Sequence, residues 1–310
     1  MCRREMLRHQ HLPSVKSYSI KMRKILVTGG SGQLAQAIKH VAQGRGVEVY
    51  APTHAECDIC NISSLELAMR GVDVVINAAA YTNVEGAESS YDDAYAVNVC
   101  GASNVALVAR RCGARLIHIS TDYVFGGEDC RTTPYSEVDA PQPINIYGRT
   151  KAEGEAEVLN GGGVVIRTSW LYSPWGKNFC RTILRSAMER GSLRVVDDQR
   201  GTPTSALSLA RCLVALVESG KYCAMSGIYH YSNSGEASWY EFAREIVTQA
   251  GVDGCDVLPC SSDEWPTVAR RPRYSCLSTE RISGIEGVNI EPWREALCEV
   301  ITIIRQSDEI

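Results

Sequence analysis

The chain has 310 residues, of which 45% are hydrophobic and 22% are charged, an ordinary balance for a globular protein. This length allows one large domain or two modest ones with a substantial core. The formal net charge of -4 provides no basic footprint for nucleic acid, and no apolar run is long enough to cross a membrane. We therefore expect a cytoplasmic protein that binds neither nucleic acid nor membrane.

The first 21 residues are basic and polar and lack the apolar middle of a secretory signal. We interpret residues 1–21 as a disordered extension, with an amphipathic targeting segment as the alternative. The thirteen cysteines are scattered along a chain that is large enough to need no disulfide scaffold. Cys57 and Cys60 have the spacing of a metal or redox half-site, but no second pair completes four ligands. We predict no metal site.

Short apolar runs alternate with helical patterns between residues 22 and 170. This alternation predicts a Rossmann-type doubly wound parallel sheet, the α/β fold class, with a nucleotide-binding domain over residues 22–170. Beyond residue 170 the alternation breaks, and residues 171–310 are expected to form mainly a smaller, partly intertwined α/β substrate lobe. A helix over residues 205–219 is expected to pack back on the first domain. The predicted strands cover residues 24–28, 47–50, 73–77, 115–119, 164–167, 194–197 and 227–231, and the predicted helices begin near residues 35, 63, 91, 147, 176, 205 and 238.

A glycine turn follows the first predicted strand and leads into a helix. Gly30, Gly32 and Ala35 fit the dinucleotide-binding fingerprint, and Gly29 and Gly32 also fit the T-G-x-x-G spacing. Glycines let the backbone approach a pyrophosphate, which the free N–H groups of the helix N-terminus can then bind. The small residues Ala78–Ala80, at the end of the third strand, would let a flat cofactor lie close to the backbone.

The segment after strand 47–50 bears on cofactor choice. A site selective for NAD favours a carboxylate there, and none is present. His54 or Arg45 could face a 2′-phosphate, so the sequence leaves both NADPH and NADH open. Asp58 could accept a hydrogen bond from the adenine amino group while Ile59 packs on the adenine face.

Tyr147 and Lys151 lie four residues apart, on one face of a predicted helix. A free phenol has a pKa of about 10, and a nearby cation lowers that pKa towards the working range of a proton donor. Thr121, Asp122 and Tyr123 leave the fourth strand at the cofactor-facing rim of the sheet. The pattern predicts a general acid, an activating cation and a hydroxyl group at one edge.

Two polar features leave alternatives open. Asn98, inside the predicted helix 91–112, either bends that helix or joins a polar relay. Arg271 and Arg273 either clamp a diphosphate, because guanidinium pairs bidentately with phosphate oxygens, or form a solvated cluster.

These segments resemble the extended short-chain dehydrogenase/reductases, and within them the dTDP-4-dehydrorhamnose reductases. The resemblance runs from about Lys24 to Ser283. It is carried by Gly29–Leu34, Asn77–Thr82, Ser120–Phe125, Tyr147–Lys151, Arg167–Trp170, Asn178-Phe179, Asp198–Thr204 and Arg271–Ser275.

The resemblance implies reduction of the 4-keto group of dTDP-4-dehydro-L-rhamnose to dTDP-L-rhamnose by NADPH or NADH. Tyr147 would donate a proton to the sugar carbonyl oxygen, Thr121 would hydrogen-bond that oxygen, and Lys151 would lower the tyrosine pKa and hold the nicotinamide ribose. The expected cofactor-binding residues are Gly29, Gly32, Gln33, Leu34, Asp58, Ile59, Ala78, Ala79, Ala80, Tyr147 and Lys151, and the expected substrate-binding residues are Thr121, Asp122, Tyr123, Trp170, Asn178 and Arg271.

One departure concerns the first helix. Some family members bind magnesium at a dimer contact through a glutamate there, and the matching residue in this chain is Ala37. We therefore expect a monomer or a weak homodimer. The alternatives are a reductase of another nucleotide-4-keto-6-deoxysugar, or a non-catalytic NADP-binding regulatory subunit that resembles the methionine adenosyltransferase beta subunit.

Overall fold

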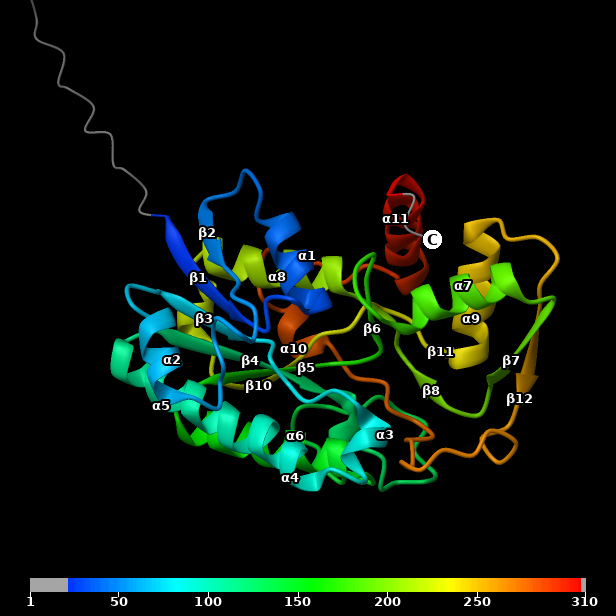
Figure 1. The fold of residues 1–310 in the computed structure, drawn as a ribbon, viewed down its shortest axis with the longest axis horizontal. Helices are drawn as coiled ribbons and strands as arrows, with labels where there is room; N and C mark the ends of the chain where they lie inside the picture. Colours follow the sequence, from blue (N-terminus) through cyan, green and yellow to red (C-terminus); the bar gives the residue numbers. More distant parts are fainter. Residues whose placement is uncertain (1–21, 308–310) are drawn as a thin grey trace, which may run out of the picture.

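The computed structural model describes residues 22–307, so the extension expected over residues 1–21 lies outside the described residues. Its centre is a six-stranded parallel sheet with the order β10-β5-β4-β3-β1-β2 (Figure 1). The predicted doubly wound α/β class is confirmed. The strands are β1 (Arg23–Thr28), β2 (Val47–Tyr50), β3 (Val74–Asn77), β4 (Arg115–Thr121), β5 (Val164–Thr168) and β10 (Gly227–His230).

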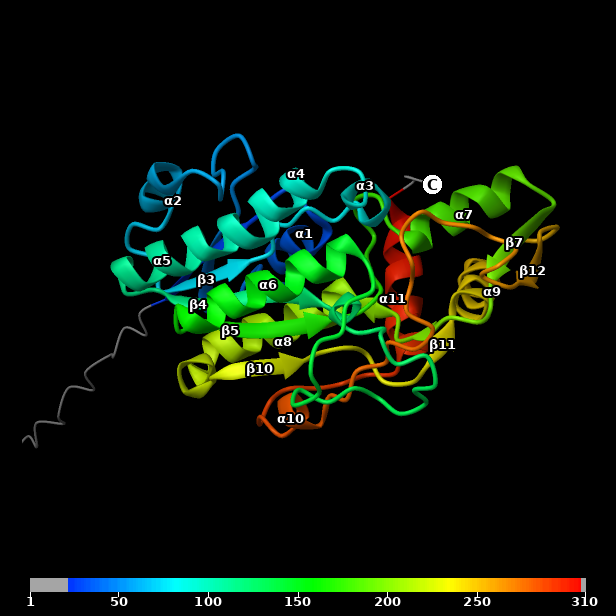
Figure 2. The same cartoon turned by 90° about the horizontal axis from the view of Figure 1, so that it is seen from below.

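The central strands are apolar on both faces because helices cover both sides of the sheet. Ile25 and Val27 of β1 join one core cluster, and Leu26 joins the other. The first cluster lies under α1 (Gln33–Val41) and α8 (Ala206–Glu218), which pack together, whereas the second lies under the helices α2 (Ile62–Ala68), α5 (Ala102–Cys112) and α6 (Ile146–Asn160) (Figure 2).

The parallel register aligns polar residues near the carboxyl edge of the sheet. Thr28 of β1 pairs with Asn77 of β3, which in turn pairs with His118 of β4. The three side chains are therefore abreast on three neighbouring strands, at the edge where open α/β sheets bind ligands.

The predicted helix 91–112 is wound in three parts: α4 (Tyr91–Tyr95), a π-helical turn η1 (Ala96–Gly101) and α5. The wider turn contains Asn98, whose buried amide bonds outside the helix. Gly113 ends α5 in the left-handed conformation, as its sequence position predicted.

The second lobe lies beyond the carboxyl edge of the sheet, at the right of Figure 1. It pairs β7 (Ser192–Val196) with β12 (Asp256–Cys260) and packs α7 (Phe179–Glu189) against α9 (Trp239–Ala250). One strand from the range 171–310, β10, instead joins the main sheet beside β5. The remaining elements are α3 (Val84–Ala87), η2 (Asp122–Val124), β6 (Leu171–Tyr172), β8 (Arg200–Gly201), β9 (Thr204–Ser205), η3 (Lys221–Ala224), β11 (Ala237–Ser238), α10 (Glu280–Ser283) and α11 (Trp293–Gln306).

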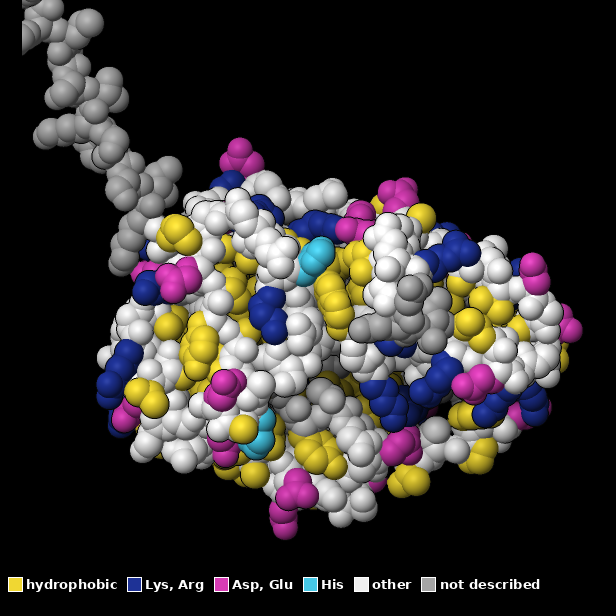
Figure 3. All heavy atoms as spheres, turned by 45° about the horizontal axis from the view of Figure 1, so that its top comes forward, with side chains coloured by type: hydrophobic (Ala, Val, Ile, Leu, Met, Phe, Trp, Pro, Cys, Tyr) yellow, Lys and Arg dark blue, Asp and Glu magenta, His cyan; other side chains and the backbone are white. Residues whose placement is uncertain are grey.

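The surface carries no broad region of one charge on the face drawn in Figure 3, where basic and acidic side chains are interspersed. Within residues 22–307, no helix has both the length and the apolar character that a membrane span requires.

Candidate active site

The glycine turn between β1 and α1 lies so close to neighbouring backbone that it has no room for side chains at Gly29 and Gly30. Gly29 has φ +72°, and a Cβ atom there would lie 3.0 Å from the Ala79 Cα atom. A Cβ atom on Gly30 would lie 2.1 Å from the Ala51 carbonyl oxygen. Gly32 is the N-cap of α1 and has no side chain to cap it, so the first-turn N–H groups are left for an anion. The turn fits a dinucleotide pyrophosphate.

The side chains of Gln33 and Leu34, the two residues after Gly32, are both engaged within the protein. The side chain of Gln33 donates a hydrogen bond to the Leu171 carbonyl oxygen (3.1 Å), which ties the turn to β6. The Leu34 side chain is buried in the core, so only its backbone can reach a cofactor.

The expected adenine site lies beside η1. Ile59 is buried, and its side chain would contact a Cβ atom built on Gly101 at 2.7 Å, so it packs beneath η1. The Asp58 carboxylate accepts a hydrogen bond from the Cys60 backbone N–H (2.9 Å) and stays partly exposed. Arg45 precedes β2 and pairs with Glu218 on α8 (2.5 Å), so this guanidinium lies at the amino end of β2, away from the cofactor edge.

Three sequence-predicted residues come together where β4 ends and α6 begins. Thr121 ends β4, and the rings of Tyr123 and Tyr147 meet edge to face with centroids 5.6 Å apart. The N-cap residue Asn145 accepts a hydrogen bond from the Gly148 N–H (2.7 Å) and starts α6 beside Tyr123. A Cβ atom on Gly148 would lie 2.0 Å from the Tyr123 carbonyl oxygen, so glycine is required for this contact.

Lys151 points from α6 onto β4. Its Nζ atom donates a hydrogen bond to the Ile119 carbonyl oxygen (2.8 Å) and lies 3.2 Å from His118 Nε2. Burial lowers the pKa of Lys151 to about 8, although Glu155 acts to raise it. Burial also raises the pKa of Tyr147, while the Thr121 side chain acts to lower it. The Lys151 amine bonds to β4, and its lowering of the Tyr147 pKa stays a prediction.

Asp122 lies behind Thr121. It is 1% exposed and accepts hydrogen bonds from the hydroxyl groups of Thr121 (3.2 Å) and Ser275 (2.6 Å). Burial raises the pKa of this carboxyl group to about 7. Asp122 thus orients Thr121 from within the protein. Ser275 holds Asp122 in place. It lies in the segment Arg271–Ser275, which carries the family resemblance, but the sequence predicted no role for it.

Arg271 already has two partners. It donates hydrogen bonds to the Tyr123 hydroxyl (3.0 Å) and to Glu85 on α3 (2.7 Å). Glu85 also accepts hydrogen bonds from the backbone N–H groups of Val268 (2.9 Å) and Ala269 (3.3 Å). Arg271 is thus paired within the protein and partly exposed, and a diphosphate contact for it stays a prediction. Arg273 is exposed.

Comparison with known proteins identifies the family. The family model described as the RmlD substrate binding domain matches residues 22–306. A dTDP-4-dehydrorhamnose reductase of Mycolicibacterium smegmatis is 39% identical over 92% of this chain and 87% of its own length. This chain belongs to the RmlD substrate-binding domain family. The resemblance inferred from the sequence is confirmed.

Two solved dTDP-4-dehydrorhamnose reductases have the same fold. The dTDP-4-dehydrorhamnose reductase of Clostridium acetobutylicum superposes with a TM-score of 0.85 at 38% identity, covering 91% of this chain and 99% of that one. The Bacillus anthracis enzyme of that name, solved in complex with NADP, has a TM-score of 0.84 at 35% identity, with the same coverage.

Trp170 has an unusual backbone conformation. Among residues 22–307 it alone combines a positive φ (45°) with a residue type other than glycine. Its indole stacks on Trp239 with centroids 3.5 Å apart and an interplanar angle of 7°. Such strain persists only where surrounding structure holds it, and it concentrates at functional sites. Trp239 carried no sequence signal beyond being an aromatic residue near a helix start.

We expect Gly201→Ala to disturb this indole pair, because the new Cβ atom would lie 2.4 Å from the Trp170 ring. The KM for the sugar substrate should rise, and the tryptophan emission spectrum should shift. Gly191→Ala is the matched control, since its Cβ atom would meet nothing closer than 4.0 Å. Equal substrate KM values for the two variants would contradict a substrate role for the Trp170 position.

Asn178 and Asn98, which the sequence also singled out, form hydrogen bonds within the protein. Asn178 caps α7: its side chain accepts a hydrogen bond from the Arg181 N–H and donates to the carbonyl oxygens of Ser173 and Trp175. Asn98 lies in the π-turn, and its amide bonds to the Tyr81 backbone and to the Thr150 hydroxyl on α6. Ala37 is fully buried, and residues 22–307 contain no group of three His, Cys, Asp or Glu side chains placed to hold a metal ion.

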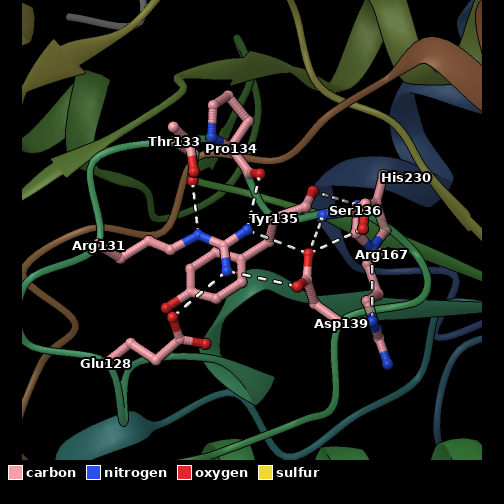
Figure 4. Close-up of polar contacts among 9 residues, drawn as sticks. All are labelled: Glu128, Arg131, Thr133, Pro134, Tyr135, Ser136, Asp139, Arg167 and His230. Carbon is pink, nitrogen blue, oxygen red and sulfur yellow. Dashed lines mark hydrogen bonds and ion pairs between the residues drawn. The ribbon is translucent and has the colours of Figure 1, made fainter.

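The loop between β4 and α6 is braced by a polar and aromatic cluster (Figure 4). Arg131 pairs with Asp139 (3.1 Å), and its guanidinium lies 4.2 Å from the centre of the Tyr135 ring. Tyr135 stacks on Phe125 (4.1 Å), whose ring is 5.0 Å from the Arg167 guanidinium. The cluster fixes the loop that leads into α6 and Tyr147.

Proposed function

We propose that this chain reduces the 4-keto group of dTDP-4-dehydro-L-rhamnose to dTDP-L-rhamnose, with NADPH or NADH as reductant. The observation that carries this proposal is the contact between Thr121 and Tyr147 where β4 ends and α6 begins, with Lys151 on the next turn of α6 and its amine bonded to β4. The NADP in the Bacillus anthracis structure supports NADPH as the cofactor.

The chemistry follows from these positions. Bound reduced nicotinamide supplies a hydride, and the protein supplies position and polarity. Gly29, Gly32 and the first turn of α1 would hold the pyrophosphate, and Lys151 would hold the nicotinamide ribose. Tyr147 donates its phenolic proton to the carbonyl oxygen, which becomes the new alcohol. Thr121 orients that oxygen, and Asp122 orients Thr121.

The direct test is turnover with dTDP-4-dehydrorhamnose, made in place by the upstream enzymes, against NADPH and NADH in parallel. The absorbance of reduced nicotinamide should fall only when the keto sugar is added. Oxidation with a different nucleotide-4-keto-6-deoxysugar alone would reassign the substrate. Cofactor binding without turnover of any keto sugar would favour the regulatory-subunit alternative.

The activity should depend on the charge of Lys151. Because burial lowers the pKa of this amine to about 8, kcat/KM should decline as the pH rises past that value and the ammonium loses its proton. Stability should change in the opposite direction. An unfolded lysine has a pKa of about 10.4, so between the two values the unfolded chain binds the extra proton, and the Lys151 contribution to the free energy of unfolding rises with pH. A pH–rate profile that stays flat up to pH about 10 would contradict the role of Lys151.

We further propose that the reaction takes place in the cytoplasm and that the chain acts as a monomer or weak homodimer. The scattered cysteines suit a reducing compartment. Ala37 offers no oxygen ligand for a metal-bridged dimer. Sedimentation with and without magnesium would test the assembly.

A further inference from the structure

A row of buried polar side chains crosses the sheet beneath the active site. Thr28, Asn77, His118 and Lys151 have exposed fractions of 0%, 0%, 1% and 2%. Register aligns the first three on β1, β3 and β4, and α6 lays Lys151 over β4. Buried polar groups are costly unless they are hydrogen-bonded, so each member of the row needs a partner.

The contacts along the row are continuous. Thr28 Oγ1 lies 2.6 Å from the Asn77 amide oxygen, and the Asn77 amide nitrogen lies 2.9 Å from His118 Nδ1. His118 Nε2 lies 3.2 Å from Lys151 Nζ. At the far end, the Ala79 backbone N–H donates a hydrogen bond to Thr28 Oγ1 (3.3 Å). Both ends of the row are therefore residues expected to touch the cofactor.

The donors and acceptors of these side chains limit which hydrogen bonds the row can form. His118 is neutral, because burial and the Lys151 charge hold its pKa well below the ordinary value, so one ring nitrogen carries a hydrogen and the other accepts. If the Asn77 amide nitrogen donates to Nδ1, the hydrogen must sit on Nε2. There it would face the Lys151 ammonium, which has only donors. That arrangement suits a neutral lysine but not a charged one.

Turning the Asn77 amide by half a turn gives both ring nitrogens of His118 a suitable partner while Lys151 is charged, and it removes the amide oxygen as the acceptor of the Thr28 hydroxyl hydrogen. His118 Nδ1–H then donates to the amide oxygen, His118 Nε2 accepts from the ammonium, and the amide nitrogen donates to Thr28 Oγ1. An asparagine amide can present either atom to a neighbour, and its orientation follows from the network around it.

We propose that His118 is a positioning residue for Lys151: its Nε2 atom accepts a hydrogen bond from the ammonium, and Asn77 holds the imidazole proton on Nδ1. Two of the three ammonium hydrogens are then anchored, to His118 and to the Ile119 carbonyl oxygen. The third is left to point away from β4, towards the cofactor ribose and Tyr147. This last step rests on the proposed function, whereas the bonding of His118 does not.

The first test reads the tautomer directly. Nitrogen-15 NMR of histidine-labelled protein, compared with the His118→Gln variant to assign the signal, should show Nδ1 protonated and Nε2 unprotonated at pH about 6.5, where Lys151 is charged. A proton on Nε2 at that pH overturns the proposal. The measurement needs no substrate, so it decides the bonding even if the chain reduces no keto sugar.

The second test separates positioning from packing. His118→Leu removes the acceptor, so we expect kcat/KM to fall by about 10²-fold, KM for reduced cofactor to rise and the basic limb of the pH profile to move to lower pH, because a misplaced, less stabilised ammonium loses its proton more readily. His118→Gln restores an acceptor oxygen and should recover most of the loss.

His230→Leu is the matched control. His230 is also a fully buried strand histidine, but it contacts Arg167 and the Tyr135 carbonyl oxygen rather than Lys151. This variant should lower stability and leave the position of the basic limb unchanged. An unshifted limb in His118→Leu, or the same shift in both leucine variants, would overturn a positioning role for His118.

Discussion

Tyr147→Phe should lower kcat by about 10²-fold or more, the typical contribution of general acid catalysis, and should leave cofactor binding unchanged. The substitution removes only the phenolic oxygen, so the proton for the sugar carbonyl oxygen has no donor. The ring can keep its edge-to-face contact with Tyr123, which preserves the start of α6. Steady-state turnover and fluorescence titration with NADPH measure the two quantities separately.

Tyr95→Phe is the control for this substitution. Tyr95 lies on α4 and is 36% exposed, so losing its hydroxyl group should change neither turnover nor cofactor affinity. Turnover by Tyr147→Phe close to that of Tyr95→Phe would remove Tyr147 from the mechanism.

Glu155→Gln should destabilise the fold by about 3–5 kcal/mol, because it leaves the Arg167 charge buried without a counter-ion. The two side chains are 0% and 3% exposed, and the guanidinium donates two hydrogen bonds to the carboxylate, at 2.9 and 2.7 Å. This pair joins β5 to α6, the helix that carries Tyr147 and Lys151. Urea unfolding followed by circular dichroism measures the loss.

The same helix offers a matched exposed pair. Arg149 and Glu153 are 58% and 36% exposed and lie one turn apart on the surface of α6. Glu153→Gln should cost only about 0.3–0.5 kcal/mol, because water already solvates both charges. If both glutamine variants unfold at the same urea concentration, the Glu155–Arg167 pair does not stabilise the fold as expected.

The elements predicted best from the sequence are those with a local cause. The strand β2 begins and ends where the apolar run predicted, and β1 and β5 agree within one residue. The helix α9 begins just after the Ser238 capping box, whose reciprocal hydrogen bonds form within four residues. Neighbouring residues alone determine such features.

Features that depend on distant partners escaped sequence analysis. The helix widens into a π-turn at Asn98, whose amide bonds to Tyr81 and Thr150 on other segments. β10 lies in the range expected for the second lobe, yet it completes the main sheet beside β5 because its apolar residues find their partners there. The periodicity of a segment does not show which distant residues that segment will contact.

The sequence by itself determined the Rossmann-type fold, the glycine turn and the four-residue spacing that puts Tyr147 and Lys151 on one helix face. These follow from backbone preferences and the period of apolar residues, which act over a few positions. Only the tertiary structure decided where the Lys151 amine points, that Arg271 is paired with Glu85 and Tyr123, and that His118 lies against the lysine. Side-chain direction, burial and pKa are set by whatever else packs at the same place, and that packing brings together residues from far apart in the chain.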